Sequence, residues 1–255
     1  MRLKVMGCSG AEFPGHNAPG FLLDNEIVFD AGSITGVLDE KAQSKIKHIF
    51  ITHAHLDHIR SIPFLADNIA VSKKTHRINI LSIPPVLRTI KKHLFNSTMW
   101  PDFTIIPDYD RAILNLIRLK VGKSTNVNSY TITPYKVSHT VPAVGYLVED
   151  EKGRRFFYTG DTRPSTETWK KIGNKKINCL IIDVSFPNSM GFMAIRTGHL
   201  TPCLLKEEIL KIQQKPDRIY ITHPKPQYER TIQVELNRLG MKNVRMLKDG
   251  ETVLI

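Results

Sequence analysis

The sequence predicts a mixed α/β fold, with sheets at its core and helices outside them. Short apolar runs that are typical of strands recur along the chain, and helix signals lie between some of them. The early strands follow one another directly, and the later ones alternate with helices. At 255 residues the chain is long enough to bury a large core. We therefore expect one domain that spans residues 1–255.

The predicted strands share a short run of mainly apolar residues. They are Leu3–Met6, Phe21–Leu23, Ile27–Phe29, His48–Thr52, Ile69–Val71, Thr131–Val137, Val144–Val148, Arg155–Thr159, Cys179–Val184, Arg218–Thr222 and Val253–Ile255. Several of these runs are followed by a histidine or an aspartate, so polar side chains are expected at strand ends.

Three helices are predicted from their termini. A proline in the first turn favours a helix over Pro85–Leu94, because its fixed φ suits that position. Thr201 is expected to cap a helix over Pro202–Leu210, since its hydroxyl can accept a hydrogen bond from the first turn. The run Gln233–Leu239 ends at Gly240, a residue typical of helix C-termini.

The composition predicts an ordinary globular protein of the cytoplasm. Hydrophobic residues make up 41% of the chain and charged residues 24%. No apolar run approaches the roughly 18–20 residues that cross a bilayer, and Met1–Gly7 enters a strand pattern without a signal-peptide core. Cys8, Cys179 and Cys203 form no CxxC pair, which fits packed, free thiols in a reducing compartment.

The net charge of +12 favours anionic partners such as nucleotides, RNA or acidic lipid. The basic residues are scattered and form no dense tail, so a solvated surface explains most of them. Charge alone therefore does not predict nucleic-acid binding. We expect a small anionic nucleotide as the partner, with nucleic acid as the alternative and no membrane contact.

The run His53–His58 is the most informative feature of the chain. Three imidazoles and a carboxylate lie within six residues, after an apolar stretch that is typical of a buried strand ending in a turn. Imidazole and carboxylate are ligands that suit zinc, manganese or iron. Such side chains are costly to bury unless they are paired or bound to metal. The run predicts a metal site rather than a polar loop that is rich in histidine.

Four further polar residues stand where an apolar strand ends or a helix begins: His139, Asp161, His199 and His223. Gly160 permits a sharp backbone turn before Asp161. Taken singly, such a histidine is more often a structural residue than a ligand. Their recurrence predicts one polar cluster at one rim of the sheets.

The candidate ligands are numerous enough for two metal ions. His53, His55 and His139 would supply three ligands to the first. Zn²⁺ is the expected ion, with Mn²⁺ or Fe²⁺ as alternatives, because such sites accept each of them according to supply.

Asp57, His58 and His223 would supply three ligands to the second metal, and the carboxylate of Asp161 could bridge the pair. A two-metal site with a bridging water suits the hydrolysis of phosphoesters. One metal lowers the pKa of the water, and the pair stabilises negative charge on the phosphate oxygens.

The order His-x-His-x-Asp-His, a single His, an Asp after Gly and a final His resembles the metallo-β-lactamase superfamily over nearly the whole chain. This resemblance implies a four-layer αββα sandwich with the metals at one edge of its two sheets. The pattern of strands and helices is compatible with that fold but does not define it.

Four segments resemble the narrower family of class II 3′,5′-cyclic-nucleotide phosphodiesterases. They are His53–Ile62, Phe95–Asp102, Asp183–Pro187 and Gly198–Pro202. Members of this family hydrolyse cyclic AMP (cAMP) or cyclic GMP (cGMP) to the 5′-monophosphate, which implies attack by a metal-bridging hydroxide. The chain is compact for the family, so the resemblance indicates the chemistry of this protein more closely than it indicates the natural substrate.

Catalytic roles are expected for His199 and Asp57. In related phosphodiesterases, including the transfer-RNA 3′-processing enzymes, a histidine in this position donates a proton to the leaving oxygen. The resemblance assigns that role to His199, with a helix cap near Pro202 as the alternative. Asp57 is chiefly a metal ligand and could also orient the water or accept its proton.

Three residues are candidates to hold the substrate. Arg60 and Arg163 lie beside the ligand motifs and could bind a phosphate, although surface ion pairs are an equal alternative. Trp100 could stack on a base, with packing in the core as the alternative.

Other functions stay open. A transfer-RNA 3′-end-processing nuclease shares the metal set and Asp161–Pro164, but the sequence has no glycine- and lysine-rich insertion for an RNA-clasping arm. Another hydrolase of this fold, such as a β-lactam or thioester hydrolase, is compatible because fold does not fix function. The full ligand set argues against a scaffold without activity. The resemblance also implies a homodimer.

Overall fold

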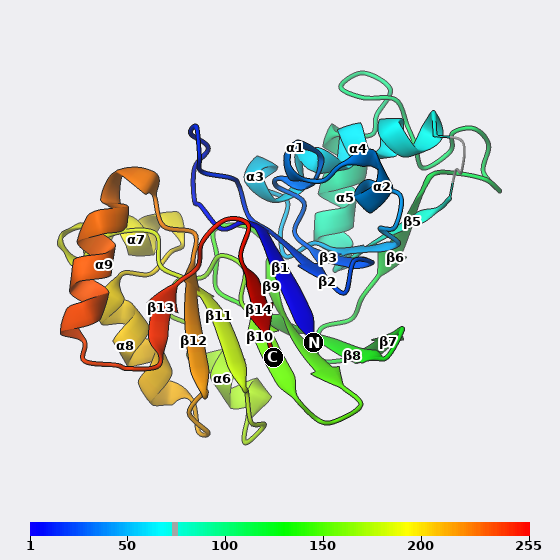
Figure 1. Ribbon diagram of the computed structural model, residues 1–255. Helices are drawn as coiled ribbons and strands as arrows, with labels where there is room; N and C mark the ends of the chain where they lie inside the picture. The colour runs from blue at the N-terminus through cyan, green and yellow to red at the C-terminus, as the bar shows by residue number, and fades with distance from the viewer. Residues whose placement is uncertain (73–75) are drawn as a thin grey trace.

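Two mixed β-sheets pack face to face in the computed structural model, which describes residues 1–72 and 76–255. Figure 1 shows the sheets at the centre of the molecule, with one group of helices outside each of them. This arrangement is the α/β sandwich that the resemblance implied.

The first sheet is antiparallel in one half and parallel in the other. In spatial order its described strands are β14 (Thr252–Leu254), β1 (Arg2–Gly7), β2 (Gly20–Leu23), β3 (Ile27–Phe29), β4 (His48–Phe50), β5 (Ile78–Ser82) and β6 (Leu114–Arg118). Because β1 pairs with β14, the two ends of the chain lie close together in this sheet (Figure 1).

The second sheet has the same division into an antiparallel and a parallel half. In spatial order its described strands are β13 (Val244–Met246), β12 (Arg218–Thr222), β11 (Cys179–Asp183), β10 (Arg155–Tyr158), β9 (Val144–Asp150), β8 (Tyr130–Lys136) and β7 (Thr125–Val127). Strand β11 is buried along its whole length, as expected for a parallel strand covered on both faces.

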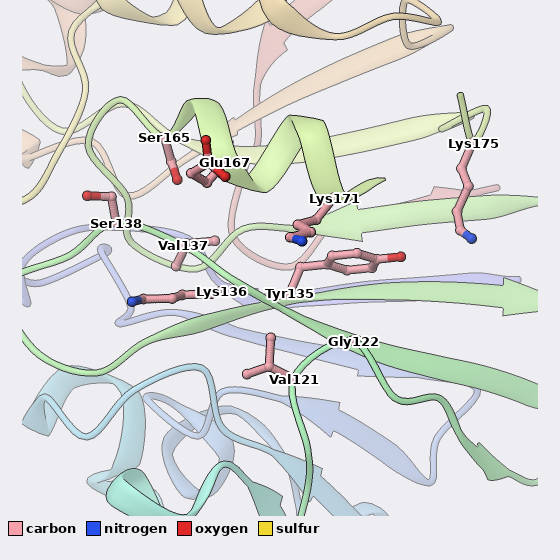
Figure 2. Close-up of a pocket in the computed structure, with 10 residues that line it drawn as sticks. All are labelled: Val121, Gly122, Tyr135, Lys136, Val137, Ser138, Ser165, Glu167, Lys171 and Lys175. Carbon is pink, nitrogen blue, oxygen red and sulfur yellow. The ribbon is translucent and has the colours of Figure 1, made fainter. Parts of the chain in front are cut away.

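Helices α1 to α5 lie on the side of the first sheet, and α6 to α9 on the side of the second (Figure 1). Helix α5 packs on β5 and β6, whereas α6 packs on β8 (Figure 2). The described helices are α1 (Ile34–Val37), α2 (Glu40–Gln43), α3 (Leu56–Ile59), α4 (Ser61–Ala70), α5 (Pro84–His93), α6 (Thr166–Ile172), α7 (Gly191–Thr197), α8 (Pro202–Lys211) and α9 (Glu229–Arg238), with short 3₁₀ turns at Asn188–Met190 and Pro226–Tyr228.

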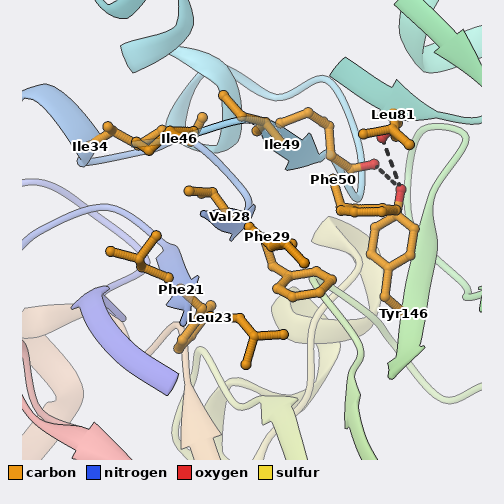
Figure 3. Close-up of a cluster of buried hydrophobic side chains, with 14 of the residues drawn as sticks. Phe21, Leu23, Val28, Phe29, Ile34, Ile46, Ile49, Phe50, Leu81 and Tyr146 are labelled. Carbon is orange, nitrogen blue, oxygen red and sulfur yellow. Dashed lines mark hydrogen bonds between the residues drawn. The ribbon is translucent and has the colours of Figure 1, made fainter. Parts of the chain in front are cut away.

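Aromatic side chains join the inner faces of the two sheets. The rings of Phe29 and Phe156 meet edge to face at 5.5 Å, and those of Phe50 and Tyr146 at 5.3 Å. In each pair one residue comes from the first sheet and the other from the second. Figure 3 shows this cluster, which holds the sheets together and so fixes the edge where their strands end.

The strand predicted at Ile69–Val71 is wrong, because this segment ends helix α4. Ile62, Leu65, Ala66 and Ile69 are all buried and are spaced as on one face of a helix. The β-branched residues at the end of the segment favour a strand locally, but packing of α4 on α1 and α2 overrides that preference.

Four of the described strands were not predicted, namely β5, β6, β7 and β13. The three helices predicted from their termini are present as α5, α8 and α9, which confirms those assignments. All three cysteines are free, but Cys203 is exposed, so the expectation of a packed thiol is wrong for it. Within the described ranges, none of the helices has the length and apolarity that a bilayer crossing requires.

Candidate metal centre

The candidate site lies where strands of both sheets end at a common edge. In the first sheet, β3 and β4 end shortly before Asp30 and His53. In the second, β8, β10 and β12 end shortly before His139, Asp161 and His223. Since strands that run in the same direction end at the same edge of a sheet, these distant parts of the sequence converge there.

A first group of ligand atoms surrounds one point at this edge. His55 Nδ1 lies 3.0 Å from His53 Nε2 and 3.2 Å from His139 Nε2. Oδ2 of Asp161 lies 3.6 Å from His53 Nε2 and 4.0 Å from His139 Nε2. His53, His139 and Asp161 are buried, and His55 is half-buried. These are the three histidines expected for the first metal, together with the aspartate expected to bridge.

A second group adjoins the first and shares Asp161 with it. His223 Nε2 lies 3.2 Å from Oδ2 of Asp57 and 3.4 Å from Oδ2 of Asp161. His58 Nε2 lies 3.4 Å from Oδ1 of Asp161 and 3.6 Å from Oδ2 of Asp57. One carboxylate oxygen of Asp161 therefore faces His58 and the other faces His53, His139 and His223. The structure brings all seven expected ligands together in two adjacent groups.

The side chains present fit a pair of divalent cations. Nε2 of His58 is buried and has no hydrogen-bond partner among the described residues, although its ring faces the carboxylates of Asp57 and Asp161. An unpaired buried nitrogen beside two carboxylates is costly unless a cation lies between them. Neutral imidazoles and ionised carboxylates are also the donors that zinc, manganese and iron accept.

The electrostatics of the site agree with this fit. Burial opposes ionisation of Asp161, yet His223 and His58 hold the pKa of its carboxyl well below its usual range. Burial likewise opposes ionisation of Asp57, and His58 and His223 again lower the pKa of that carboxyl. Burial lowers the pKa of His53, which keeps this imidazole neutral with a lone pair to donate. The carboxylates are therefore charged while His53 is not. Burial opposes the charge on His58, but Asp161, Asp30 and Asp57 raise the pKa of this imidazole, so the site favours positive charge between its carboxylates.

Buried hydrogen bonds behind the cluster orient its ligands. Asp30 accepts from His58 Nδ1 at 2.7 Å, from the Thr52 amide at 2.8 Å and from the Tyr158 hydroxyl at 2.7 Å. His139 Nδ1 donates to the Gly198 carbonyl at 2.9 Å. The bonds from His58 and His139 each fix a proton on Nδ1 and leave Nε2 to face the cluster. Sequence reasoning missed Asp30, although it also follows a predicted strand directly.

His199 lies beside the cluster and is held by a buried carboxylate. Its Nδ1 donates to Oδ2 of Asp183 at 2.8 Å, and Ser185 Oγ donates to Oδ1 at 2.7 Å. Burial opposes the charge on His199, but Asp183 raises the pKa of the imidazole above its ordinary value. The hydroxyl of Thr201 accepts from the Leu204 amide and caps α8. The capping prediction for Thr201 is thus confirmed, and the helix-cap alternative for His199 is wrong.

The two arginines expected near the substrate are engaged with the protein. Arg60 forms an ion pair with Glu12, and its Nε donates to the Gly32 carbonyl at 2.8 Å. Arg163 Nε donates to Ser138 Oγ at 3.1 Å. Both lie two residues after a member of the cluster, so they border the site without entering either ligand group.

Trp100 is partly buried in a small aromatic contact. Its ring lies 5.0 Å from that of Phe64, which is itself exposed. The indole N–H is buried without a hydrogen-bond partner in the described parts of the chain. The structure thus places Trp100 against a neighbouring helix and outside both ligand groups.

Comparisons with known proteins agree with this fold and site. A family profile described as "Beta-lactamase superfamily domain" matches residues 27–223. The "Probable 3',5'-cyclic-nucleotide phosphodiesterase" of Yersinia pestis is 27% identical over 212 residues, which are 73% of this chain and 59% of that protein. A "Ribonuclease Z" of Methanococcus maripaludis is 26% identical over 221 residues, which are 79% of this chain and 68% of that protein.

Among solved structures, unliganded yeast PDE1 superposes with a TM-score of 0.85 at 18% identity, and covers 100% of this chain and 99% of its own. That likeness shows a shared fold. The profile match spans more than half of the chain and includes all seven clustered ligands, the last of which is His223. The chain therefore belongs to the metallo-β-lactamase superfamily of metal-dependent hydrolases.

Proposed function

We propose that this protein is a dinuclear metal-dependent phosphodiesterase that hydrolyses 3′,5′-cyclic nucleotides to 5′-monophosphates. The observation that carries the proposal is the pair of ligand groups joined by Asp161, with His199 beside them. Opening a cyclic phosphodiester needs an activated water and a proton for the leaving alkoxide. The name of the Yersinia pestis relative supports this choice of substrate.

The proposed ligands fall into two sets that share one aspartate. The sets are His53, His55, His139 and Asp161, and Asp57, His58, His223 and Asp161. Two divalent cations held there, with Zn²⁺ as the proposed ion, would lower the pKa of a water and stabilise negative charge on the phosphate. Asp57 is partly exposed, so its carboxylate could in addition orient that water.

His199 is the proposed general acid for the leaving oxygen. Its ring centroid lies 5.4 Å from that of His139 and 5.1 Å from that of His223, so it borders both ligand groups. Asp183 binds its Nδ1, which leaves Nε2 free to hold the proton that the ribose 3′-oxygen requires. Asp183 is thus a positioning residue for His199.

Arg60, Arg163 and Trp100 are proposed to contact the substrate around this centre. The arginines border the two ligand motifs, and a substrate phosphate could compete for guanidinium groups that now bind Glu12 and Ser138. Trp100 is only partly buried, and its proposed role is to stack on the base of the nucleotide.

An RNA 3′-end-processing nuclease of the transfer-RNA type is the second candidate. It is favoured by the Ribonuclease Z relatives, one of which this chain matches over a larger share of both lengths than the phosphodiesterase. The net charge of +12 also suits a polyanionic substrate.

The test is hydrolysis by purified protein loaded with Zn²⁺ or Mn²⁺. We would supply cAMP, cGMP and a transfer-RNA precursor with a 3′ trailer, and resolve the products by chromatography. His139→Ala removes a proposed ligand, and His93→Ala is the matched control because His93 is exposed on α5. We expect 5′-monophosphates from the wild type and His93→Ala only. Trailer release without cyclic-nucleotide turnover would replace the first proposal with the second.

A further inference from the structure

A groove of about 860 Å³ lies on the outer face of the second sheet, beside helix α6 (Figure 2). Its walls come from three segments: the end of β8 and the residues after it, helix α6 with its flanking residues, and the turn at Val121 and Gly122. Tyr135 and Val137 point to this face, because they pack in the cluster between the second sheet and its helices.

Unpaired cations line this groove. Lys136, Lys171 and Lys175 are exposed, and none of the three has an ion-pair partner among residues 1–72 and 76–255. Glu167 also lines the groove, but Lys170 binds its carboxylate at 2.9 Å. Three lysines and one glutamate line the groove, so it presents an excess of positive charge.

The floor of the groove adds an aromatic donor to these cations. The ring of Tyr135 meets that of Phe157 edge to face at 6.2 Å, which fixes its position. Its hydroxyl has no hydrogen-bond partner in the described ranges, and burial raises the pKa of this group, so it stays a donor. Tyr135 is otherwise buried, so the groove offers a ligand its hydroxyl, the lysines and apolar side chains such as Val121, a combination that suits phosphates joined to less polar groups.

The groove and the candidate metal centre are linked along the chain at Ser138. Ser138 lines the groove and directly precedes His139. The backbone of Ser138 is bridged to Arg163, which follows Asp161 by two residues. Ser138 and Arg163 thus connect the groove, along the chain, to the proposed ligands His139 and Asp161.

A second hollow of about 530 Å³ adjoins the groove at Lys175. Lys175 lines both hollows, and Arg155, Lys176 and Gln214 line the second. In the second hollow Arg155 pairs with Glu149 and Lys176 with Asp217, so the unpaired cations are those of the groove itself. A cyclic nucleotide carries a single phosphate, which the proposed function puts at the metals, so it leaves the groove without an occupant.

We propose that the α6–β8 groove binds the phosphodiester backbone of a single-stranded polynucleotide. Each lysine would neutralise one phosphate, and the hydroxyl of Tyr135 would donate a hydrogen bond to a backbone oxygen. This inference concerns binding outside the metal centre, and it goes beyond the proposed hydrolysis of cyclic nucleotides.

The test measures the binding of a 5′-fluorescein dodecauridylate by fluorescence anisotropy at several salt concentrations. The groove variant combines Lys136→Gln, Lys171→Gln and Lys175→Gln. The matched control combines Lys41→Gln, Lys45→Gln and Lys242→Gln, which removes the same charge from exposed lysines on other elements. Circular dichroism and hydrolysis of bis(p-nitrophenyl) phosphate, compared with the wild type, would check that both variants are folded.

We expect the groove variant to bind at least about tenfold more weakly at 0.1 M salt, because three phosphate contacts are lost. Its plot of log K against log salt should be flatter by about 2, since each contact with a single strand contributes roughly 0.7. The control variant should bind as the wild type does, and Tyr135→Phe should weaken binding without a change in slope.

Three results would overturn the proposal. The wild type could fail to bind the strand, or both triple variants could lose affinity equally, which would show only diffuse surface charge. Alternatively, tripolyphosphate could bind through the same lysines with the affinity of the strand, which would make a free polyphosphate the ligand. Hydrolysis of cAMP by the same preparations separates these results from a failure of the proposed function, because the groove variant keeps every proposed metal ligand.

Discussion

Nδ1 of His58 donates a hydrogen bond of 2.7 Å to Oδ2 of Asp30, and both side chains are fully buried. The same carboxylate accepts from Thr52 before the ligand motif and from Tyr158 at the end of β10. Asp30 therefore ties the first sheet to the second directly behind the candidate metal centre. The orientation of a proposed ligand thus depends on a residue outside both ligand groups.

Replacing Asp30 by asparagine should weaken metal binding while the proposed ligands stay intact. The amide cannot accept from His58, Thr52 and Tyr158 with the strength of a charged carboxylate, so the imidazole loses its fixed orientation. We expect a loss of roughly 10–100-fold in affinity for Zn²⁺, as is usual for such supporting residues. Competition with a chromophoric chelator measures it. Asp39→Asn, at the exposed N-cap of α2, is the control, and equal affinity in both variants would contradict the prediction.

The proton-donor role of His199 predicts a loss that depends on the leaving group. His199→Ala should slow cAMP hydrolysis by roughly 10²–10⁴-fold, because a ribose alkoxide needs a proton as it leaves. Hydrolysis of bis(p-nitrophenyl) phosphate should fall far less, since p-nitrophenolate is stable without one. Asp183→Asn should show the same pattern in weaker form. Similar losses for both substrates would mean that His199 serves the structure or the metals instead.

The sequence was sufficient to predict the proposed ligands because their signal is local. A histidine or aspartate that directly follows an apolar strand can be identified without knowing the pairing of strands, and His53, His139, Asp161 and His223 all have this signal. Because the strands before these residues run in the same direction, they end at one edge, and the side chains converge there in the two ligand groups. Asp30 has the same signal but not the surrounding motif, which is why it was overlooked.

The supporting bonds and the sheet edges could not be predicted in this way. The carboxylate of Asp183 binds His199 across 16 residues of sequence, a contact that depends on how β11 and α7 are placed. Strands β5 and β6 contain asparagines that pair across the sheet, so their apolar pattern is interrupted. Such features depend on tertiary packing, and the apolar pattern of a single segment does not indicate how that segment packs.

Removing metal should destabilise the fold at its sheet edge. Without cations, the carboxylates of Asp57 and Asp161 rely on His58 and His223 for charge compensation. Bound metal at 100 times its dissociation constant should add about 2.7 kcal/mol to the free energy of unfolding. Calorimetry before and after chelation, and again after Zn²⁺ is restored, measures the shift in Tm. A Tm that is the same in all three states would argue against a metal site in the native protein.

The buried hydroxyl of Tyr146 links the two sheets. Removing it together with the hydroxyl of Ser82 should lower the free energy of unfolding by more than the two single removals added together. Tyr146 donates to the Ile51 carbonyl at 2.7 Å (Figure 3). Ser82 donates to the same carbonyl at 2.6 Å. Tyr146→Phe and Ser82→Ala should each lower the free energy of unfolding by about 1 kcal/mol, because one donor remains. The double variant leaves the carbonyl unpaired, so its loss should exceed the sum of the two. Chemical denaturation tests this cycle, and simple additivity would contradict it.

Gly198 lies against a proposed ligand, and a single methyl group at this position should displace it. A Cβ on Gly198 would lie 2.4 Å from Nδ1 of His139, the nitrogen that donates to the Gly198 carbonyl. The residue also has a φ of +88°, which disfavours alanine by itself. Gly240 is the matched control, because its φ is +67° and nothing lies within 4 Å of its Cβ position. Both alanine variants should lose about 1 kcal/mol from backbone strain, but only Gly198→Ala should lower the ratio of bound Zn²⁺ to protein. Equal metal content in the two variants would show that displacing His139 does not weaken metal binding, which would contradict its proposed role as a ligand.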